Sequence, residues 1–117
     1  MTPAHILFPV DFSERSTGTA PHVDAVARQF GSKVTLLHAW QPAPFAGYEM
    51  AIAATAKDLR NLLRAFAKEH LPKIETAEVL KAGEAAAEIT RFALERGVDL
   101  IMMPSHGYGS AAFFWDR

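Results

Sequence analysis

The stretch that decides the fold is HILFPVDFS, residues 5–13. It is an apolar run that stops abruptly at polar residues, beginning with Asp11. A second apolar run, LIMMPSHG at residues 100–107, stops in the same way at small and polar residues. In an open parallel sheet the carboxyl ends of neighbouring strands meet in one crevice, where ligands of such folds bind. The two runs therefore predict that Asp11 and Gly107, distant in the sequence, share a site.

Around these runs, short apolar strands alternate with longer segments of helical period. The expected strands lie within residues 5–13, 34–40, 76–80 and 100–107. The expected helices follow Ser13 as far as Gly31, run from Ile52 to just before Pro72, and run from Gly83 to Gly97. Ser13 is a favourable N-cap residue, and Gly31 is a favourable stop for the first helix. This alternation predicts an α/β domain, a doubly wound parallel sheet with helices on both faces.

Composition restricts the class of protein. The chain has 117 residues, half of them hydrophobic, which indicates one domain with a single core. Twelve basic and thirteen acidic residues give a formal charge of −1 without a block of like charge, so neither nucleic acid nor a membrane surface is expected as a partner. The sequence contains no cysteine, no signal pattern and no apolar stretch long enough to span a bilayer. We therefore expect a cytoplasmic protein.

Three stretches carry a family resemblance. ILFPVDFSE at residues 6–14, LLHA at residues 36–39 and VDLIMMPSHG at residues 98–107 resemble the signature sequences of the universal stress protein (UspA-like) family. The likeness ends near Gly109, so we expect an incomplete domain over residues 1–109 and an aberrant apolar tail over residues 110–117. The resemblance implies an adenine nucleotide alpha hydrolase-like fold with five parallel strands, usually as a homodimer. Many family members bind ATP or related adenine nucleotides, and others act through protein contacts without a nucleotide.

The resemblance also implies a binding site for ATP or AMP, with Mg²⁺ accompanying the nucleotide. The implied binding residues are Pro9, Val10, Asp11, Ala39, Met103, Pro104, Ser105, His106 and Gly107. Residues 9–11 would lie beside adenine and ribose, with Asp11 accepting hydrogen bonds from ribose hydroxyls, and Ala39 would line the base pocket. The phosphates would lie over a Gly-x-x-Gly turn, which here reads Pro104-Ser105-His106-Gly107. Pro104 replaces the first glycine and has no amide to donate.

The tail departs further from the family pattern, because the expected Gly-Ser pair, the last helix and the last strand are missing. Codons can be chosen for GSAAFFWDR, residues 109–117, that another frame reads as Phe-Arg-Arg-Phe-Leu-Leu-Gly-Ser, a stretch typical of the family. We therefore interpret the chain as truncated or frameshifted. The strand at residues 100–104 would then be an unprotected apolar edge, partly covered by the tail or left to contact neighbouring molecules. We expect lower stability than in intact relatives and a weakened homodimer.

Several of these residues also have a structural interpretation. Asp11 could cap the following helix, and His38 within an apolar strand is expected to be a hydrogen-bonded core residue. Ser105 and His106 are adjacent and lack a nucleophile elbow, so we expect no catalysis beyond slow ATP hydrolysis. The five histidines show no metal-ligand spacing, so no metal is expected.

Two classes of function remain open. The first is a stress-response protein in which ATP or AMP changes the dimer or the choice of partner. The second is a nucleotide-free interaction module of the same fold. A phosphoacceptor signalling domain would need an acidic cluster beside an acceptor aspartate at another strand end, and only Asp11 is suitably placed.

Overall fold

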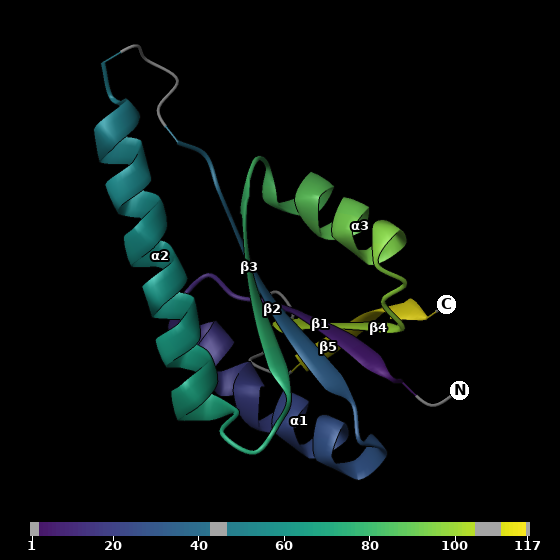
Figure 1. Cartoon of the computed structure of the whole chain (residues 1–117). Coiled ribbons are helices and arrows are strands. Elements are labelled where there is room, and N and C mark those ends of the chain that lie inside the picture. The colour runs from purple at the N-terminus through teal and green to yellow at the C-terminus, as the bar shows by residue number, and fades with distance from the viewer. Residues whose placement is uncertain (1–2, 43–46, 105–110, 117) are drawn as a thin grey trace.

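The computed structural model describes residues 3–42, 47–104 and 111–116, the last segment through its backbone alone. Within these residues one sheet of five strands packs with three helices (Figure 1). The elements are β1 His5–Pro9, α1 Glu14–Phe30, β2 Lys33–Trp40, α2 Glu49–His70, β3 Thr76–Ala82, α3 Ala85–Glu95, β4 Leu100–Pro104 and β5 Ala111–Asp116. The predicted α/β class and the predicted alternation of strands and helices as far as β4 are confirmed.

The sheet has the strand order β3-β2-β1-β4-β5, and its first four strands are parallel. The chain builds outwards from β1 to β3 and then returns to place β4 on the other side of β1. Ile6 is paired with Leu100 and Leu7 with Ile101, so the two runs that predicted the fold are neighbours. The direction of winding reverses beside β1, and the carboxyl ends of the strands at such a reversal form a ligand crevice in open α/β sheets.

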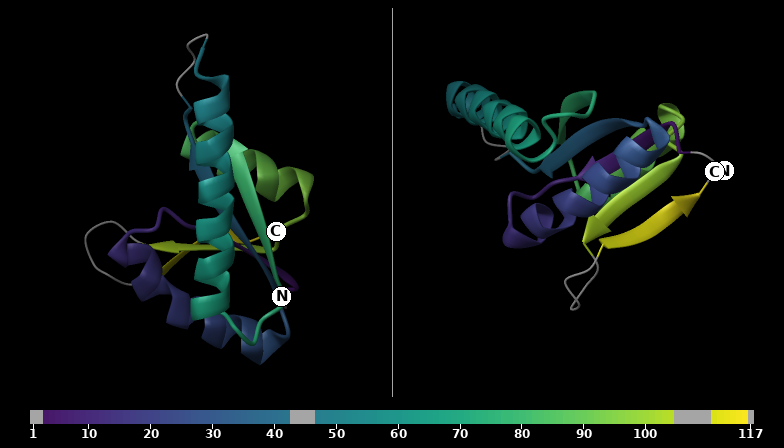
Figure 2. Two further views of the ribbon diagram at one scale, coloured as in Figure 1. Left: turned by 60° about the vertical axis from the view of Figure 1, so that its left-hand side comes forward. Right: turned by 90° about the horizontal axis from the view of Figure 1, so that it is seen from below.

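β5 corrects the prediction made for the tail. This strand runs antiparallel to β4, with Pro104 paired to Ala111 and Leu100 to Asp116 (Figure 2). Of the two outcomes expected for the edge of β4, the first is therefore found, because the apolar tail pairs with β4 and covers it. Phe and Trp residues favour strands, and an unpaired apolar strand offers them a row of free backbone groups. An antiparallel strand thus stands where the family resemblance implied a fifth parallel one.

Helices cover both faces of the sheet (Figures 1 and 2). α1 and α2 lie on one face and α3 on the other, and each face has its own hydrophobic core. β1 contributes to both cores, since Ile6 and Phe8 pack on the side of α1 and α2 while Leu7 packs on the side of α3. All three side chains are fully buried. A strand covered on both faces is apolar throughout, which is why residues 5–10 read as one continuous run.

The first helix begins and ends where the sequence predicts. Ser13 is its N-cap residue, and the side chain of Ser13 accepts a hydrogen bond from the Ser16 amide. Gly31 ends the helix with φ 64°, a left-handed conformation that glycine adopts without strain. α1 continues through Pro21 without interruption. These signals place the first turn of α1 directly beyond the carboxyl end of β1, next to Asp11.

Candidate functional site

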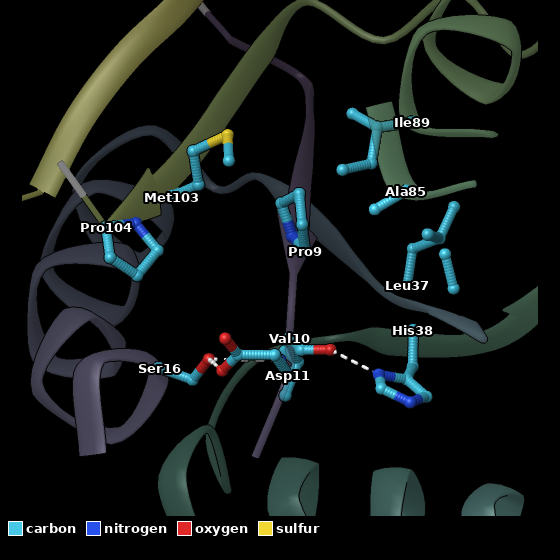
Figure 3. Close-up of a pocket in the computed structure, with 11 residues that line it drawn as sticks. Pro9, Val10, Asp11, Ser16, Leu37, His38, Ala85, Ile89, Met103 and Pro104 are labelled. Carbon is cyan, nitrogen blue, oxygen red and sulfur yellow. Dashed lines mark hydrogen bonds between the residues drawn. The ribbon is translucent and has the colours of Figure 1, made fainter. Parts of the chain in front are cut away.

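A cavity of about 170 Å³ lies at the carboxyl ends of β1, β2 and β4 (Figure 3). The lining residues are Pro9, Val10, Asp11, Ser16, Leu37, His38, Ala39, Ala85, Ile89, Met103 and Pro104. The structure thus brings together the implied binding residues Pro9, Val10, Asp11, Ala39, Met103 and Pro104. The remaining three, Ser105, His106 and Gly107, lie outside the described residues. Most of the lining is apolar. Among the described residues that line the cavity, Asp11 is the only one of the types Asp, Glu, Lys and Arg.

Hydrogen bonds hold the Asp11 carboxylate in one orientation. Asp11 Oδ1 accepts from the Ser13 amide at 3.0 Å, from the Ser13 hydroxyl at 2.5 Å and from the Ser16 hydroxyl at 2.8 Å. The Asp11 amide in turn donates to Ser16 Oγ at 3.1 Å. A hydrogen bond to a charged group contributes roughly 1.5–3 kcal/mol. The first turn of α1 therefore fixes the carboxylate at the rim of the cavity.

The same hydrogen bonds determine the charge of Asp11. Burial raises the pKa of the carboxyl, but the hydrogen bonds from Ser13 and Ser16 outweigh burial and hold the pKa below its usual value. The group is therefore ionised at neutral pH. Among the described residues no hydrogen bond uses Asp11 Oδ2. Figure 3 shows this oxygen on the side that faces Pro104, so it can accept a hydrogen bond from a ligand while Oδ1 stays bound to the helix.

The end of β1 is tied to β2 just before Asp11. The Val10 amide donates to the Leu37 carbonyl at 2.8 Å, and His38 Nδ1 lies 2.7 Å from the Val10 carbonyl oxygen (Figure 3). Because a carbonyl oxygen only accepts hydrogen bonds, Nδ1 carries the proton and donates it. The expectation that His38 is hydrogen-bonded is confirmed, but its side chain is half-buried and also lines the cavity. This pair of bonds holds the backbone that presents Asp11.

Phe12, the next residue, has φ 64°. This left-handed conformation is rare for a bulky residue and costs about 1–2 kcal/mol. The ring centroid of Phe12 lies 4.8 Å from that of His38 and 6.5 Å from that of Phe66 in α2. A strained backbone persists where its surroundings hold it, and such residues are concentrated at functional sites. The strain directly beside the ionised carboxylate therefore marks this loop as part of the site.

Sequence reasoning did not identify all of the lining. Ser16 had a signal, because it lies three residues after an N-cap serine and on the helical turn nearest Asp11. Ala85 and Ile89 are four positions apart, so they share one face of α3, but nothing in the sequence shows which sheet edge that face meets. The conformation of Phe12 had no signal, because φ is not encoded by the identity of a phenylalanine. In the part of the chain described, no three His, Asp or Glu side chains gather as metal ligands would.

Comparison with known proteins places this site in a family. The model of the universal stress protein family matches residues 3–115, almost the whole chain. The chain belongs to the universal stress protein family. Universal stress protein MJ0577 of Methanocaldococcus jannaschii is 28% identical to it over an alignment of 123 positions, gaps included, that covers 87% of this chain and 76% of MJ0577.

Solved structures of universal stress proteins share the fold. The structure of MJ0577 has a TM-score of 0.73 at 27% identity, covering 92% of this chain and 78% of MJ0577. A universal stress protein family member from Burkholderia pseudomallei has a TM-score of 0.71 at 20% identity, over 90% of this chain and 83% of that one. A universal stress protein in complex with cAMP has a TM-score of 0.58 at 22% identity, over 86% of this chain and 71% of that one. The universal stress protein fold is thus shared across these structures.

Proposed function

We propose that this universal stress protein binds an adenine nucleotide, ATP or AMP, in the cavity at the carboxyl ends of β1, β2 and β4. The observation that carries the proposal is the ionised Asp11 carboxylate, which borders a mostly apolar cavity. Its Oδ2 has no hydrogen-bond partner among the described residues. A carboxylate at a strand end can accept hydrogen bonds from ribose hydroxyls. Binding would serve a stress response by changing the dimer or the choice of partner, with hydrolysis slow at most.

The apolar lining suits a planar base. Pro9 and Ala39 come from the adjacent strands β1 and β2, Val10 directly follows β1, and Met103 comes from β4 on the other side of β1. Small-molecule sites are mostly apolar with a few fixed polar groups, and they typically enclose about 300–1,000 Å³. The cavity here is about 170 Å³. It therefore has room for the base and part of the ribose, and the phosphates would extend beyond its described lining.

One structure of the same fold agrees with an adenine nucleotide as the ligand. A universal stress protein of the same fold forms a complex with cAMP, which contains adenine and ribose. Mg²⁺ would accompany ATP through the phosphates rather than through a preformed protein site. The proposal for this chain nevertheless rests on its own Asp11 and cavity.

Calorimetric titration with ATP and with AMP tests the proposal. We expect saturable binding with a Kd below about 1 mM, equivalent to roughly −4 kcal/mol or tighter. Asp11→Asn keeps Oδ1 as an acceptor for Ser13 and Ser16 but replaces Oδ2 with a donor, so it should weaken binding by about tenfold or more. Asp24→Asn is the matched control, because Asp24 pairs with Arg28 in α1 and does not line the cavity. Equal binding by both variants, or no binding by the folded protein, would contradict the proposal.

A nucleotide-free interaction module remains the second candidate, and exposed apolar side chains of α2 favour it. The first half of α2 extends past the sheet (Figure 1), and two large apolar side chains of this helix are exposed, Met50 by 88% and Leu62 by 51%. Absence of nucleotide binding together with a stable dimer in sedimentation would favour this candidate, and a charge placed at Met50 should then weaken the dimer.

The cellular location stays a prediction. Among the described residues no helix combines the length and the apolar character needed to cross a bilayer. The cytoplasm expected from the sequence can be checked by fractionation.

A further inference from the structure

A second cavity lies beside the last turn of α3, where the strands of the sheet begin. Its volume is about 310 Å³, at the lower end of the range for small-molecule sites. The polar part of its lining consists of His5 and Lys33, the first residues of β1 and β2, together with Thr35 and Arg96. It shares no lining residue with the cavity beside Asp11. α3 therefore borders two separate cavities, one at each of its ends (Figure 1).

The polar lining of this second cavity is cationic. Lys33 and Arg96 are exposed, and among the described residues that line the cavity there is no Asp or Glu. Neither cation forms an ion pair with a described residue. Asp99 is close to His5, but its Oδ2 already accepts the amides of Ala4 and His5, each at 3.0 Å. Two cations that share a cavity without a counterion attract an anion.

The floor of the cavity carries two further polar groups. His5 and Lys33 are paired across β1 and β2, so their side chains lie on the same face of the sheet. His5 Nε2 lies 2.7 Å from the hydroxyl oxygen of Thr35, which is buried within an otherwise apolar part of β2. When His5 is protonated, Nε2 donates to this oxygen, and the Thr35 hydroxyl is free to donate its own proton to a ligand. Protonation of His5 thus prepares the floor for an anion.

One wall of the cavity is apolar. It consists of Ala77 and Val79 from β3 and the buried ring of Phe92 from α3. The Arg96 guanidinium carbon lies 5.8 Å from the centroid of the Phe92 ring, and the His5 ring meets it edge to face with centroids 6.4 Å apart. A guanidinium over an aromatic ring is held by cation–π attraction. The wall therefore places one cation at the rim and offers a surface to a carbon skeleton.

The end of α3 gives one of the two cations a structural role as well. Arg96 is the C-cap residue of α3, and cations are stabilised at the carboxyl ends of helices. This role does not extend to Lys33, which belongs to β2. It also leaves the cavity beside the two cations unexplained.

We propose that the second cavity binds an organic phosphate, a phosphomonoester whose carbon skeleton packs against Phe92 and whose phosphate contacts Lys33 and Arg96. A phosphomonoester carries a charge of about −1.5 to −2 at neutral pH, which matches two cations better than the single charge of a carboxylate. Inorganic phosphate would leave the apolar wall unused. The inference is independent of the nucleotide proposal, because the two cavities have no residue in common.

Calorimetric titration with phenyl phosphate at low ionic strength tests the inference. We expect saturable binding with a Kd below about 1 mM, which weakens as salt is added. Benzoate has one charge and inorganic phosphate has no ring, so each should bind at least about threefold more weakly. The amide NMR signals of Lys33, Thr35 and Ala77 should shift on binding, whereas that of Asp11 should not. Absence of binding by the folded protein, or benzoate binding as tightly as phenyl phosphate, would overturn the inference.

Charge-removing variants identify the groups that hold the phosphate. Lys33→Gln and Arg96→Gln should each weaken binding of phenyl phosphate by about threefold or more, and Lys33→Arg should stay within about twofold of the unaltered protein. Lys57→Gln is the matched control, because Lys57 is an exposed lysine of α2, on the other face of the sheet. An equal loss in the control would show an effect of net charge alone. A lower Tm with unchanged affinity would show that the two cations serve only the fold, and either result would refute the site.

The titration of His5 reports whether the anion lies in this cavity. Burial and the nearby Lys33 lower the pKa of His5, while Asp99 and a hydrogen bond to the backbone of Arg96 raise it. A bound anion favours the charged imidazolium, so saturating phenyl phosphate should raise the pKa of His5 measured by NMR. An unchanged pKa would place the anion elsewhere and contradict the inference. The nucleotide proposal would stand in that case, since its test uses the other cavity.

Discussion

Phe12 provides the sharpest test of the loop that presents Asp11. Its φ of 64° predicts that glycine is preferred to alanine at this position, because glycine adopts the left-handed region without strain. Elsewhere the order is reversed, since glycine in a helix or strand is less stable than alanine by about 0.5–1 kcal/mol. The two substitutions Phe12→Gly and Phe12→Ala both remove the ring, so their difference isolates the backbone conformation.

The magnitudes follow from the packing. Replacing a buried phenylalanine with alanine costs about 3–5 kcal/mol, and Phe12 is only half-buried against His38 and Phe66, so we expect Phe12→Ala to lose about 2 kcal/mol. Phe12→Gly loses the same contacts but relieves about 1–2 kcal/mol of strain. Glycine also adds freedom to the unfolded chain, which costs about 0.4–1 kcal/mol. Phe12→Gly should therefore be the more stable variant by about 0.5–1 kcal/mol.

Urea unfolding of the two variants measures this difference, and the midpoints can be compared directly if the slopes agree. Ala53→Gly in α2 is the control, because Ala53 is an exposed helical residue where glycine should destabilise the protein by about 1 kcal/mol. An equal or greater stability of Phe12→Ala would refute the left-handed conformation, and with it the inference that strain holds this loop.

Three further predictions concern the rest of the fold. A Cβ atom at Gly83 would lie 2.6 Å from Oε2 of the buried Glu88, so Gly83→Ala should lower the free energy of unfolding in urea by about 1–2 kcal/mol. In a Glu88→Ala background the same substitution should cost less, and strictly additive effects would contradict the contact. Burial lowers the pKa of His5 from 6.5, so the stability that its neutral form contributes is present above pH 6.5 and is lost as the pH falls towards the folded pKa. His5→Gln should therefore reduce the fall in Tm between about pH 7.5 and 5.5, and an unchanged fall would contradict this contribution of His5. Removal of residues 111–117 should expose β4, lower the Tm and increase light scattering, and an unchanged Tm without scattering would show that β5 does not protect this edge.

Local patterns account for how much of this fold could be predicted. Continuous apolar runs at residues 5–10 and 100–104 indicate strands buried on both faces, and the capping residues Ser13 and Gly31 mark the ends of α1. The position of Asp11 follows from the rule that ligands bind beyond the carboxyl ends of strands. These features depend on the residues themselves and on their near neighbours, so the sequence is enough to predict them.

The features that escaped prediction depend on distant partners. β5 forms because β4 presents an unpaired ladder, and the tail alone does not show whether it will pair in a parallel or an antiparallel direction. Likewise, Ala85 and Ile89 face the cavity only because α3 packs over the end of β2. Such contacts are set by tertiary packing, so they become visible only once the elements are assembled.

The structural and functional interpretations of Asp11 need not compete, because its carboxylate has two oxygens. Oδ1 accepts all the hydrogen bonds that Ser13 and Ser16 donate to the side chain, and these bonds hold Ser13, the N-cap residue of α1, in place. The same bonds hold the pKa low, so they keep the group charged. They also restrict rotation of the carboxylate, which keeps Oδ2 on the side that faces Pro104 (Figure 3). The support that Asp11 gives to the helix cap is therefore what prepares it as an acceptor, and a variant that spares Oδ1 separates binding from folding.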